Sequence, residues 1–336
     1  MREGGWARMG GREFHGVLEH VPDVAAAPER LHTPGHWVLV GDFDGPVRAW
    51  RFARIGAVTS TGRRWRGTDG WTSSMDRDAY VDGVHRVRAA IREGEVYQAN
   101  LCRVLSAPLP AEPDAAALTD RLAAGNPAPY AAAIQVPGQW VVSASPELFL
   151  RIADGRITSA PIKGTARTAE GLTAKDRAEN VMITDLVRND LQRVCHPGTV
   201  RVDDLLAVEE HPGLVHLVST VSGELRTADW AALLSATFPP GSVSGAPKSA
   251  ALRVIAALET ALRGPYCGLI GWAEVDAEGG LTAELAVGIR TFWWSDGVLR
   301  FGTGAGITWG SDPEGEWAET ELKAERLIAL ATGERA

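Results

Sequence analysis

Glu147 and Lys163 are residue types that can divide the work of an acid and a nucleophile. Glu147 ends the triplet SPE at 145–147, and Lys163 stands in PIKGT at 161–165. Only four of the 34 lysines and arginines are Lys, which can lose its proton in a desolvated site and attack an electrophile. A neighbouring carboxyl and amine also shift each other's pKa. From spacing alone, the alternative is a surface salt bridge.

Two further segments carry carboxylates at helical spacing. Glu179 lies in KDRAENVMITDLVRND (175–190), at the edge of an apolar stripe. Glu316, Glu319 and Lys323 share one face of a later segment. Carboxylate oxygens on such a face suit a hard cation bound beside an anionic ligand. The alternative is a solvated helix with ion pairs between residues four apart.

Two segments contain small residues that let the backbone approach a ligand. PGSVSGAPK (240–248) leads into a helical pattern, and the free N–H groups of such a start bind anions. It does not match the phosphate-binding pattern GxxxxGK[ST]. FGTGAGI (301–307) contains a GxGxG run, but no strand–helix–strand unit surrounds it, which argues against a dinucleotide site.

Composition excludes several classes of function. The formal net charge is −8 and no basic stripe is visible, which argues against a nucleic-acid-binding protein. Cys102, Cys195 and Cys267 are too widely spaced for a metal motif and indicate reduced thiols. No apolar run reaches the roughly 18 residues of a membrane span. We therefore expect a cytoplasmic protein that binds neither nucleic acid nor membrane.

Local patterns predict strands separated irregularly by helices. Helical spacing of Tyr80, Val84, Val87 and Ile91 predicts a helix that begins after Ser74 and ends at Gly94, and further helices are expected at about 175–193, from 249 and at about 315–332. Strands are expected at 36–40, 49–52, 96–101, 130–136, 140–143, 148–152, 268–275, 281–294 and 298–301. This order favours an α+β fold on large, mostly antiparallel sheets. No linker is evident, so we expect one domain, with residues 1–74 as a short β-rich N-terminal part and 75–336 as the catalytic core.

The order of the motifs resembles that of the chorismate-utilising enzymes. The motifs are GEVYQANL (94–101), SPE (145–147), PIKGT (161–165), the segment 176–190, HLVS (216–219), SGAPK (244–248), IRT (289–291) and GAG (304–306). The resemblance covers about residues 75–332. It implies the family's α/β/β/α fold, in which two large antiparallel sheets pack together with outer helices.

Two positions separate the reactions within that family. Members that add water at C2 of chorismate resemble one another in carrying a base Lys where this chain has Gln98. Members that aminate C2 to form anthranilate usually carry Ala where this chain has Lys163. The chain is therefore similar to members that aminate C4 and form 4-amino-4-deoxychorismate. The resemblance implies a covalent intermediate on Lys163, with Glu147 as the general acid.

The same resemblance implies a metal, a substrate pocket and a partner. Mg²⁺ is expected on Glu179 and Glu319, with Glu316 as a supporting acid. Arg290 is expected to grip a carboxylate of chorismate, and other positions that match the pocket are Gln98, Gly164, Thr165, His216, Ser242, Tyr266, Gly306 and Lys323. Ammonia is expected from a separate glutamine amidotransferase subunit, and the product would feed p-aminobenzoate for folate or for a specialised metabolite.

Two alternatives stay open at this point. One is an enzyme that aminates chorismate at C2, of the anthranilate or aminodeoxyisochorismate synthase type. The other is a regulatory subunit that binds chorismate without turnover.

Overall fold

The computed structural model describes residues 4–58, 62–211 and 214–333. Its strands are β1 (Trp6–Met9), β2 (Arg12–Val21), β3 (Gly35–Gly41), β4 (Val47–Ala57), β5 (Thr72–Ser73), β6 (Gln98–Pro108), β7 (Tyr130–Val136), β8 (Gln139–Ser145), β9 (Leu148–Ala153), β10 (Arg156–Ala160), β11 (Ile162–Ala166), β12 (Arg201–His211), β13 (Leu214–Glu224), β14 (Gly245–Ala246), β15 (Leu269–Val275), β16 (Leu281–Val287), β17 (Thr291–Ser295) and β18 (Val298–Ile307). The helices are α1 (Arg77–Arg92), α2 (Ala115–Gly125), α3 (Ala174–Gln192), α4 (Trp230–Thr237), α5 (Gly241–Ser244), α6 (Lys248–Leu258) and α7 (Pro313–Thr332), with short 3-10 turns η1 (Pro28–His32) and η2 (Ala169–Gly171).

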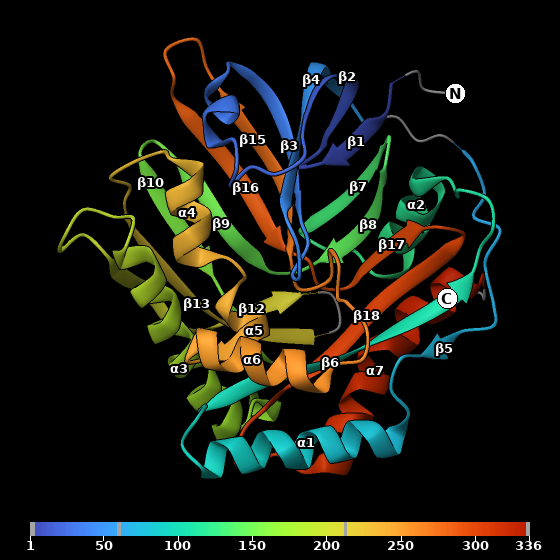
Figure 1. Cartoon of the computed structure of the whole chain (residues 1–336), viewed down its shortest axis with the longest axis vertical. Coiled ribbons are helices and arrows are strands. Elements are labelled where there is room, and N and C mark those ends of the chain that lie inside the picture. The colour runs from blue at the N-terminus through green and yellow to red at the C-terminus, as the bar shows by residue number, and fades with distance from the viewer. Residues whose placement is uncertain (1–3, 59–61, 212–213, 334–336) are drawn as a thin grey trace.

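Antiparallel pairing links the strands of the described residues into one network. It runs in the order β12, β13, β10, β9, β16, β15, β3, β4, β2, β1, β7, β8, β17, β18 and β6. β11 also pairs with β13, and β5 and β14 pair with β6. The N-terminal strands thus lie between strands from the middle and the end of the chain, as Figure 1 shows.

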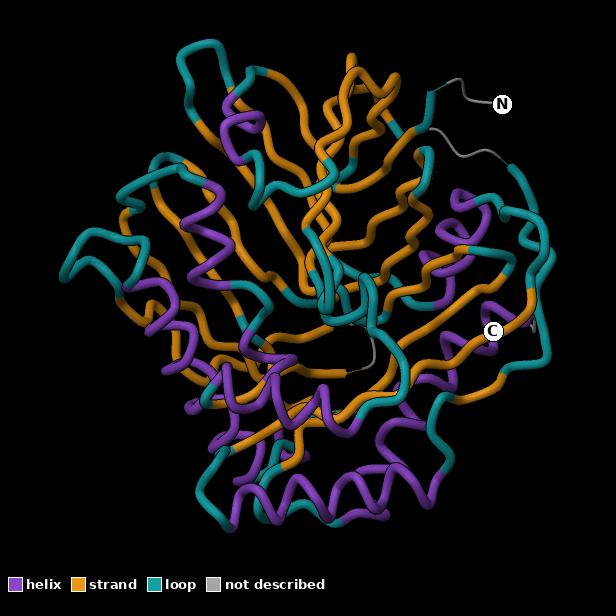
Figure 2. Tube along the Cα trace, in the orientation of Figure 1, coloured by secondary structure: helices purple, strands orange, loops and turns teal. Residues whose placement is uncertain are grey.

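The helices cover the outside of the sheets. α3 packs on β11, β12 and β13, α2 packs on β7 and β8, and α7 packs on β18. Figure 2 shows the helices at the periphery and the strands between them. The structure is 30% helical and 39% strand, so the predicted α+β class with two large antiparallel sheets and outer helices is confirmed.

Several helices begin where their sequence allows a cap. The Asp76 side chain accepts a hydrogen bond from the Ala79 N–H at 2.9 Å and starts α1, whose Tyr80, Val84 and Val87 are buried as predicted. Thr173 and Asp176 form a capping box at the start of α3. β11, the strand that carries Lys163, precedes this helix in the chain, with η2 between them.

One predicted strand is wrong. The sequence predicted a continuous strand over 281–294, but β16 ends at Val287 and β17 begins at Thr291. Arg290, between them, has a φ of 52°, in the left-handed region outside the regular β conformation. The apolar pattern continues across the break because both strands are buried. α2, α4, β12 and β13 were not predicted, and the helix expected from 249 is α6, which ends at Leu258.

A buried ion pair fixes the sheet beneath the predicted site. Arg263, fully buried, donates to both carboxylate oxygens of Glu259 at 2.6 and 2.8 Å, to Asn100 O at 2.7 Å and to Val243 O at 2.8 Å. Each polar group of this pair is therefore satisfied, which a buried charge requires. Within the described residues, no helix combines the length and apolar character needed to cross a membrane.

Candidate functional site

Glu147 lies at the turn between β8 and β9 and is buried. The backbone holds this turn, because Val287 N–H donates to Glu147 O at 3.0 Å and Glu147 N–H donates to Ser145 Oγ at 3.2 Å. Burial raises the pKa of Glu147 to about 7, although a hydrogen bond to Ser242, the charge of Lys163 and the Ile162 N–H each lower it. Near neutral pH this carboxyl can therefore donate a proton.

Lys163 stands on β11 and points toward Gly306 at the end of β18. A β-carbon on Gly306 would lie 3.3 Å from Lys163 Nζ, so the amine and the Gly306 backbone are neighbours. Burial lowers the pKa of Lys163, the charge of Lys323 lowers it further, and Glu179, Glu147 and Glu319 oppose this shift. A lowered pKa makes the neutral, nucleophilic amine more accessible. The structure thus brings Glu147 and Lys163 together with both shifted toward their uncharged forms.

Gln98 begins β6 and is fully buried beside the same glycine. A β-carbon on Gly306 would stand 2.3 Å from Gln98 Nε2. Neither Nε2 nor Oε1 of Gln98 has a hydrogen-bond partner among the described residues. Buried amides are almost always hydrogen-bonded, so this one indicates a ligand position.

The three candidate metal carboxylates lie on α3 and α7 around two lysines. Lys175 Nζ is 2.9 Å from Glu316 Oε1 and 3.7 Å from Glu179 Oε1. Lys323 Nζ is 2.6 Å from Glu319 Oε1 and 3.0 Å from Gly304 O. Burial acts to raise the pKa of Glu319, but Lys323, Lys175 and Lys163 lower it overall. These charges lie close enough to Lys163 to influence it.

The donor set at this place fits a hard cation that the substrate helps to bind. Glu179 Oε1 is buried and has no hydrogen-bond partner within the part of the chain that the structure describes. In that part, no three His, Cys, Asp or Glu side chains are gathered to hold a metal ion as they stand. Mg²⁺ usually takes only one or two protein carboxylates and completes its shell with water and substrate oxygens. The arrangement therefore fits Mg²⁺ bound together with an anionic ligand.

Arg290 is a partly buried cation at the break between β16 and β17. Burial lowers the pKa of its guanidinium. Its carbonyl accepts from the Ala144 N–H at 3.0 Å, which places it near the turn that carries Glu147. A guanidinium in this setting suits a carboxylate ligand.

The other predicted pocket residues are Ser242, Gly164, His216, Thr165 and Tyr266. Ser242 contacts Glu147, and Gly164 (φ 89°) packs so tightly on α3 that a β-carbon there would lie 2.8 Å from Asp176 Cβ. His216 is buried on β13 and pairs through its backbone with Thr165, whose side chain lies outside the described part. Tyr266 is buried under Gly302, and its hydroxyl accepts from the Cys102 thiol at 3.7 Å.

Sequence reasoning missed two ion pairs at the site. Lys175 stands four residues before Glu179, but its shorter contact is to Glu316. Lys248 Nζ binds Asp190 Oδ2 at 2.6 Å, a pair that joins two motifs far apart in the chain. Neither pair had a local signal. The spacing of four between Lys175 and Glu179 marks only the longer of the two Lys175 contacts.

Comparisons with known proteins show which family the sequence matches. Residues 56–329 match the sequence pattern of the family described as chorismate binding enzyme. The chain is 34% identical to the aminodeoxychorismate synthase component 1 of Salmonella typhimurium over 97% of this chain and 76% of that protein. It is 40% identical to the anthranilate synthase component 1 of Streptomyces coelicolor over 78% of this chain and 53% of that protein. This chain thus spans about half the length of the Streptomyces relative.

Solved structures share the fold. The menaquinone-specific isochorismate synthase MenF of Escherichia coli superposes with a TM-score of 0.80 over 98% of this chain and 88% of that chain, at 21% identity. The predicted α/β/β/α family fold is therefore confirmed.

Proposed function

The chain belongs to the family of chorismate binding enzymes, and from that premise we propose that it is an aminodeoxychorismate synthase that aminates chorismate at C4. The observation that carries the proposal is the position of the Lys163 amine beside Gly306, with Glu147 as a buried acid of raised pKa. Both groups are shifted toward the forms that a nucleophile and a general acid need.

The chemistry follows from these two groups. The neutral amine of Lys163 attacks C2 of the ring, the ring double bond shifts, and the C4 hydroxyl leaves. Glu147 gives its proton to that hydroxyl, which departs as water. Ammonia then attacks C4, the double bond shifts back, and the C2–nitrogen bond to Lys163 breaks. The proton that ammonia loses returns to the Glu147 carboxylate, so the residue is ready for another turnover.

Gln98 bears on which nucleophile is used. An amide cannot accept a proton from water at neutral pH, whereas a Lys at this position can. The buried and unpaired Gln98 amide therefore supports substrate or ammonia binding rather than activation of water at C2.

Mg²⁺ would be held by Glu179 and Glu319, with Glu316 in support. When bound, the ion supplies positive charge that holds the ring carboxylate of chorismate. Arg290 offers a second cation for the other carboxylate, and Lys323 lies between Glu319 and Gly304. The chorismate dianion would then be fixed at both carboxylates, with its ring over Gly306.

The name component 1 of both relatives suggests that ammonia is delivered by a separate glutamine amidotransferase. We extend this to the present chain as part of the proposal. The product would be converted to p-aminobenzoate, for folate or for a specialised metabolite.

The proposal is tested by incubating the protein with chorismate, Mg²⁺ and an ammonium salt. We expect chorismate to be consumed and p-aminobenzoate to appear once an aminodeoxychorismate lyase is added. Chromatography separates this product from anthranilate. If anthranilate forms, or if aminated product accumulates that the lyase does not convert, the C4 assignment is wrong.

A second candidate is amination at C2, which the 40% identity to an anthranilate synthase component favours. Lys163 argues against it, because direct attack of ammonia at C2 has no use for a nucleophilic Lys beside the ring. A chorismate-binding subunit without turnover is the third reading of the site. Chorismate that binds in the presence of Mg²⁺ and is recovered unchanged would support it.

A further inference from the structure

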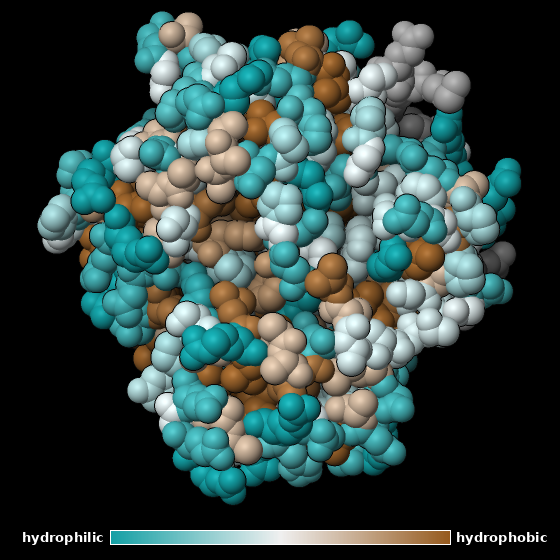
Figure 3. All heavy atoms as spheres, in the orientation of Figure 1, coloured by the Kyte–Doolittle hydropathy of each residue, from teal (hydrophilic) through white to brown (hydrophobic). Residues whose placement is uncertain are grey.

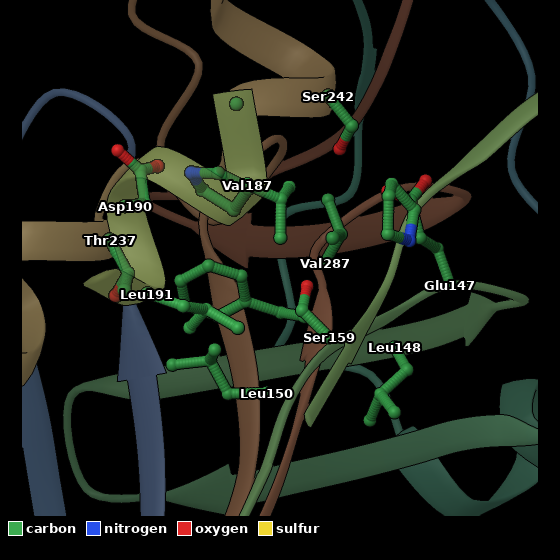
Figure 4. Close-up of a pocket in the computed structure, with 14 residues that line it drawn as sticks. Glu147, Leu148, Leu150, Ser159, Val187, Asp190, Leu191, Thr237, Ser242 and Val287 are labelled. Atoms are coloured by element: carbon green, nitrogen blue, oxygen red, sulfur yellow. The ribbon is translucent and has the colours of Figure 1, made fainter. Parts of the chain in front are cut away.

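A small cavity lies against Glu147. Of its lining residues, Glu147 and Ser242 belong to the candidate site, and the cavity reaches Asp190 and Thr237, as Figure 4 shows. It has about 20 Å³ of room for the centre of a water molecule. One water needs roughly 10–15 Å³ by this measure, so the cavity holds about one water and no larger ligand.

Glu147 and Ser242 both line this cavity. Hydrogen bonds orient the Glu147 carboxyl. The groups that face the Glu147 carboxyl are the Ser242 hydroxyl on α5 and the Ile162 N–H and the Lys163 amine on β11, with Asp190 of α3 also lining the cavity. Ser242 is the only one of these that lies on a single-turn helix, so its position must be fixed from outside that turn.

The segment that carries Ser242 connects α4 to α6 and is attached at both ends by one ammonium. Lys248, the first residue of α6, donates to Thr237 O, the last residue of α4, at 3.0 Å. The same ammonium donates to Asp190 Oδ2 on α3 at 2.6 Å. Lys248 and Asp190 are both largely buried, with side-chain exposures of 17% and 13%. Three helices thus meet at this ion pair.

Other contacts hold the far part of the same segment. Gly245 and Ala246 pair with Ala99 and Gln98, and Arg263 donates to Val243 O. On the cavity side of Ser242, the segment is held by the Lys248 contacts, by the Phe238 N–H, which donates to Leu234 O at 2.9 Å, and by the packing of Gly241 on Leu186. A desolvated ion pair contributes little net stability compared with apolar packing. We therefore assign this pair a role in positioning the segment rather than in stabilising the fold.

We propose that Lys248, held by Asp190, is a positioning residue that sets the acid strength of Glu147 through Ser242. The ion pair clamps the ends of the 238–247 segment so that the Ser242 hydroxyl donates to the Glu147 carboxylate. When the clamp is lost, Ser242 no longer stabilises the ionised carboxyl, and Glu147 becomes a weaker acid. This inference rests on the proposed role of Glu147 in the reaction, but the Ser242 contact and the cavity exist independently of turnover.

The test measures the ionisation of Glu147 without any substrate. The carboxyl band of Glu147 is titrated by infrared spectroscopy as the difference between each protein and its Glu147→Gln counterpart. We expect Ser242→Ala and Lys248→Met each to move the midpoint upward by a similar amount, on the order of one pH unit. Because both act on one hydrogen bond, the double variant should shift no further than either single variant.

Two further variants separate positioning from the loss of a charge. Asp190→Asn with Lys248→Met removes both charges together, so a through-space effect cancels while a lost clamp still raises the midpoint. Arg188→Met is the matched control, because it removes another cation of α3, one that pairs with Asp185 and not with Asp190. Its midpoint should equal that of the wild type. Thermal unfolding checks that each variant is folded, and Lys248→Arg provides a folded variant with the charge retained if Lys248→Met is unstable.

The outcomes are distinct. The inference is overturned if Lys248→Met leaves the Glu147 midpoint unchanged, if its shift adds in full to that of Ser242→Ala, or if the charge-neutral double variant behaves like the wild type. If the infrared shifts occur while chorismate yields no C4-aminated product, the positioning holds and the proposed function fails.

Discussion

Gly306 faces the Gln98 amide so closely that a β-carbon at position 306 would stand 2.3 Å from Gln98 Nε2. The same β-carbon would lie 3.3 Å from Lys163 Nζ. Only a glycine therefore leaves the amide and the amine where they are. On the face that Figure 3 shows, polar side chains prevail, and apolar side chains gather in the middle, in the lower part and at one place on the upper edge. The site is thus defined by a few buried polar groups around one glycine.

Gly306→Ala is expected to reduce chorismate turnover by about a hundredfold or more, because a displacement of roughly 1 Å at reacting groups costs that much. The flexible end of Gln98 can move aside, so the fold should persist. Steady-state kinetics and circular dichroism measure the two effects. Gly310→Ala is the matched control, since a β-carbon there meets nothing within 4 Å. Equal activity of the two variants would contradict the assignment of Gly306 to the site.

Gln98→Leu is expected to stabilise the protein while it weakens chorismate binding. The change removes two buried polar atoms that have no partner within the described residues, and each such atom costs about 1–3 kcal/mol. Unfolding in urea should therefore show a gain of about 1 kcal/mol or more, and calorimetry should show weaker binding. Gln135→Leu provides the contrast, because Gln135 accepts from the Ala115 N–H and donates to Glu112, and its loss should destabilise. A destabilised Gln98→Leu protein would mean that Gln98 is a structural residue.

Lys163→Ala is expected to lower C4 amination by about a thousandfold or more, as removal of a nucleophile does. Mass spectrometry of the intact wild-type protein, given chorismate and Mg²⁺ but no ammonia, should show a covalent adduct on the peptide that contains Lys163. Lys163→Arg keeps the positive charge without the nucleophile and should form no adduct. If Lys163→Ala forms 4-amino-4-deoxychorismate as fast as the wild type, the covalent route is ruled out.

The sequence predicts the secondary structure well where its periodicity is local and poorly where the chain bends. The buried stripe of Tyr80, Val84 and Val87 identifies α1, and the capping residues set its start. The break at Arg290 escapes prediction because apolar residues continue on both sides of it. Its positive φ arises from how two strands join the network, which no local pattern encodes.

The site residues show the same limit. Motif order identifies Glu147, Lys163 and the carboxylates, but it does not tell which cation lies beside which anion. Lys175 pairs with Glu316, and Lys248 pairs with Asp190, across 141 and 58 residues of chain respectively. The first contact joins α3 to α7, and the second joins α3 to α6. Only the three-dimensional structure brings them together.

Glu147→Gln is expected to change how stability depends on pH. In the folded protein the pKa of Glu147 is about 7, against an ordinary value of 4.5, so between these values the folded protein keeps a proton that the unfolded chain has released. Unfolding then releases a proton, and the free energy of unfolding falls as pH rises. The contribution is fully present below pH 4.5, is lost as pH rises through 7, and amounts to about 3 kcal/mol at 1.36 kcal/mol per unit.

The Gln variant lacks this decline, so its stability relative to the wild type should improve by about that amount from pH 4.5 to 7.5. Urea unfolding at several pH values measures it, with Glu95→Gln at an exposed position as the control for losing a carboxylate. Curves of wild type and Glu147→Gln that stay parallel over this range would show that Glu147 is ionised in the folded protein and is not the acid proposed here.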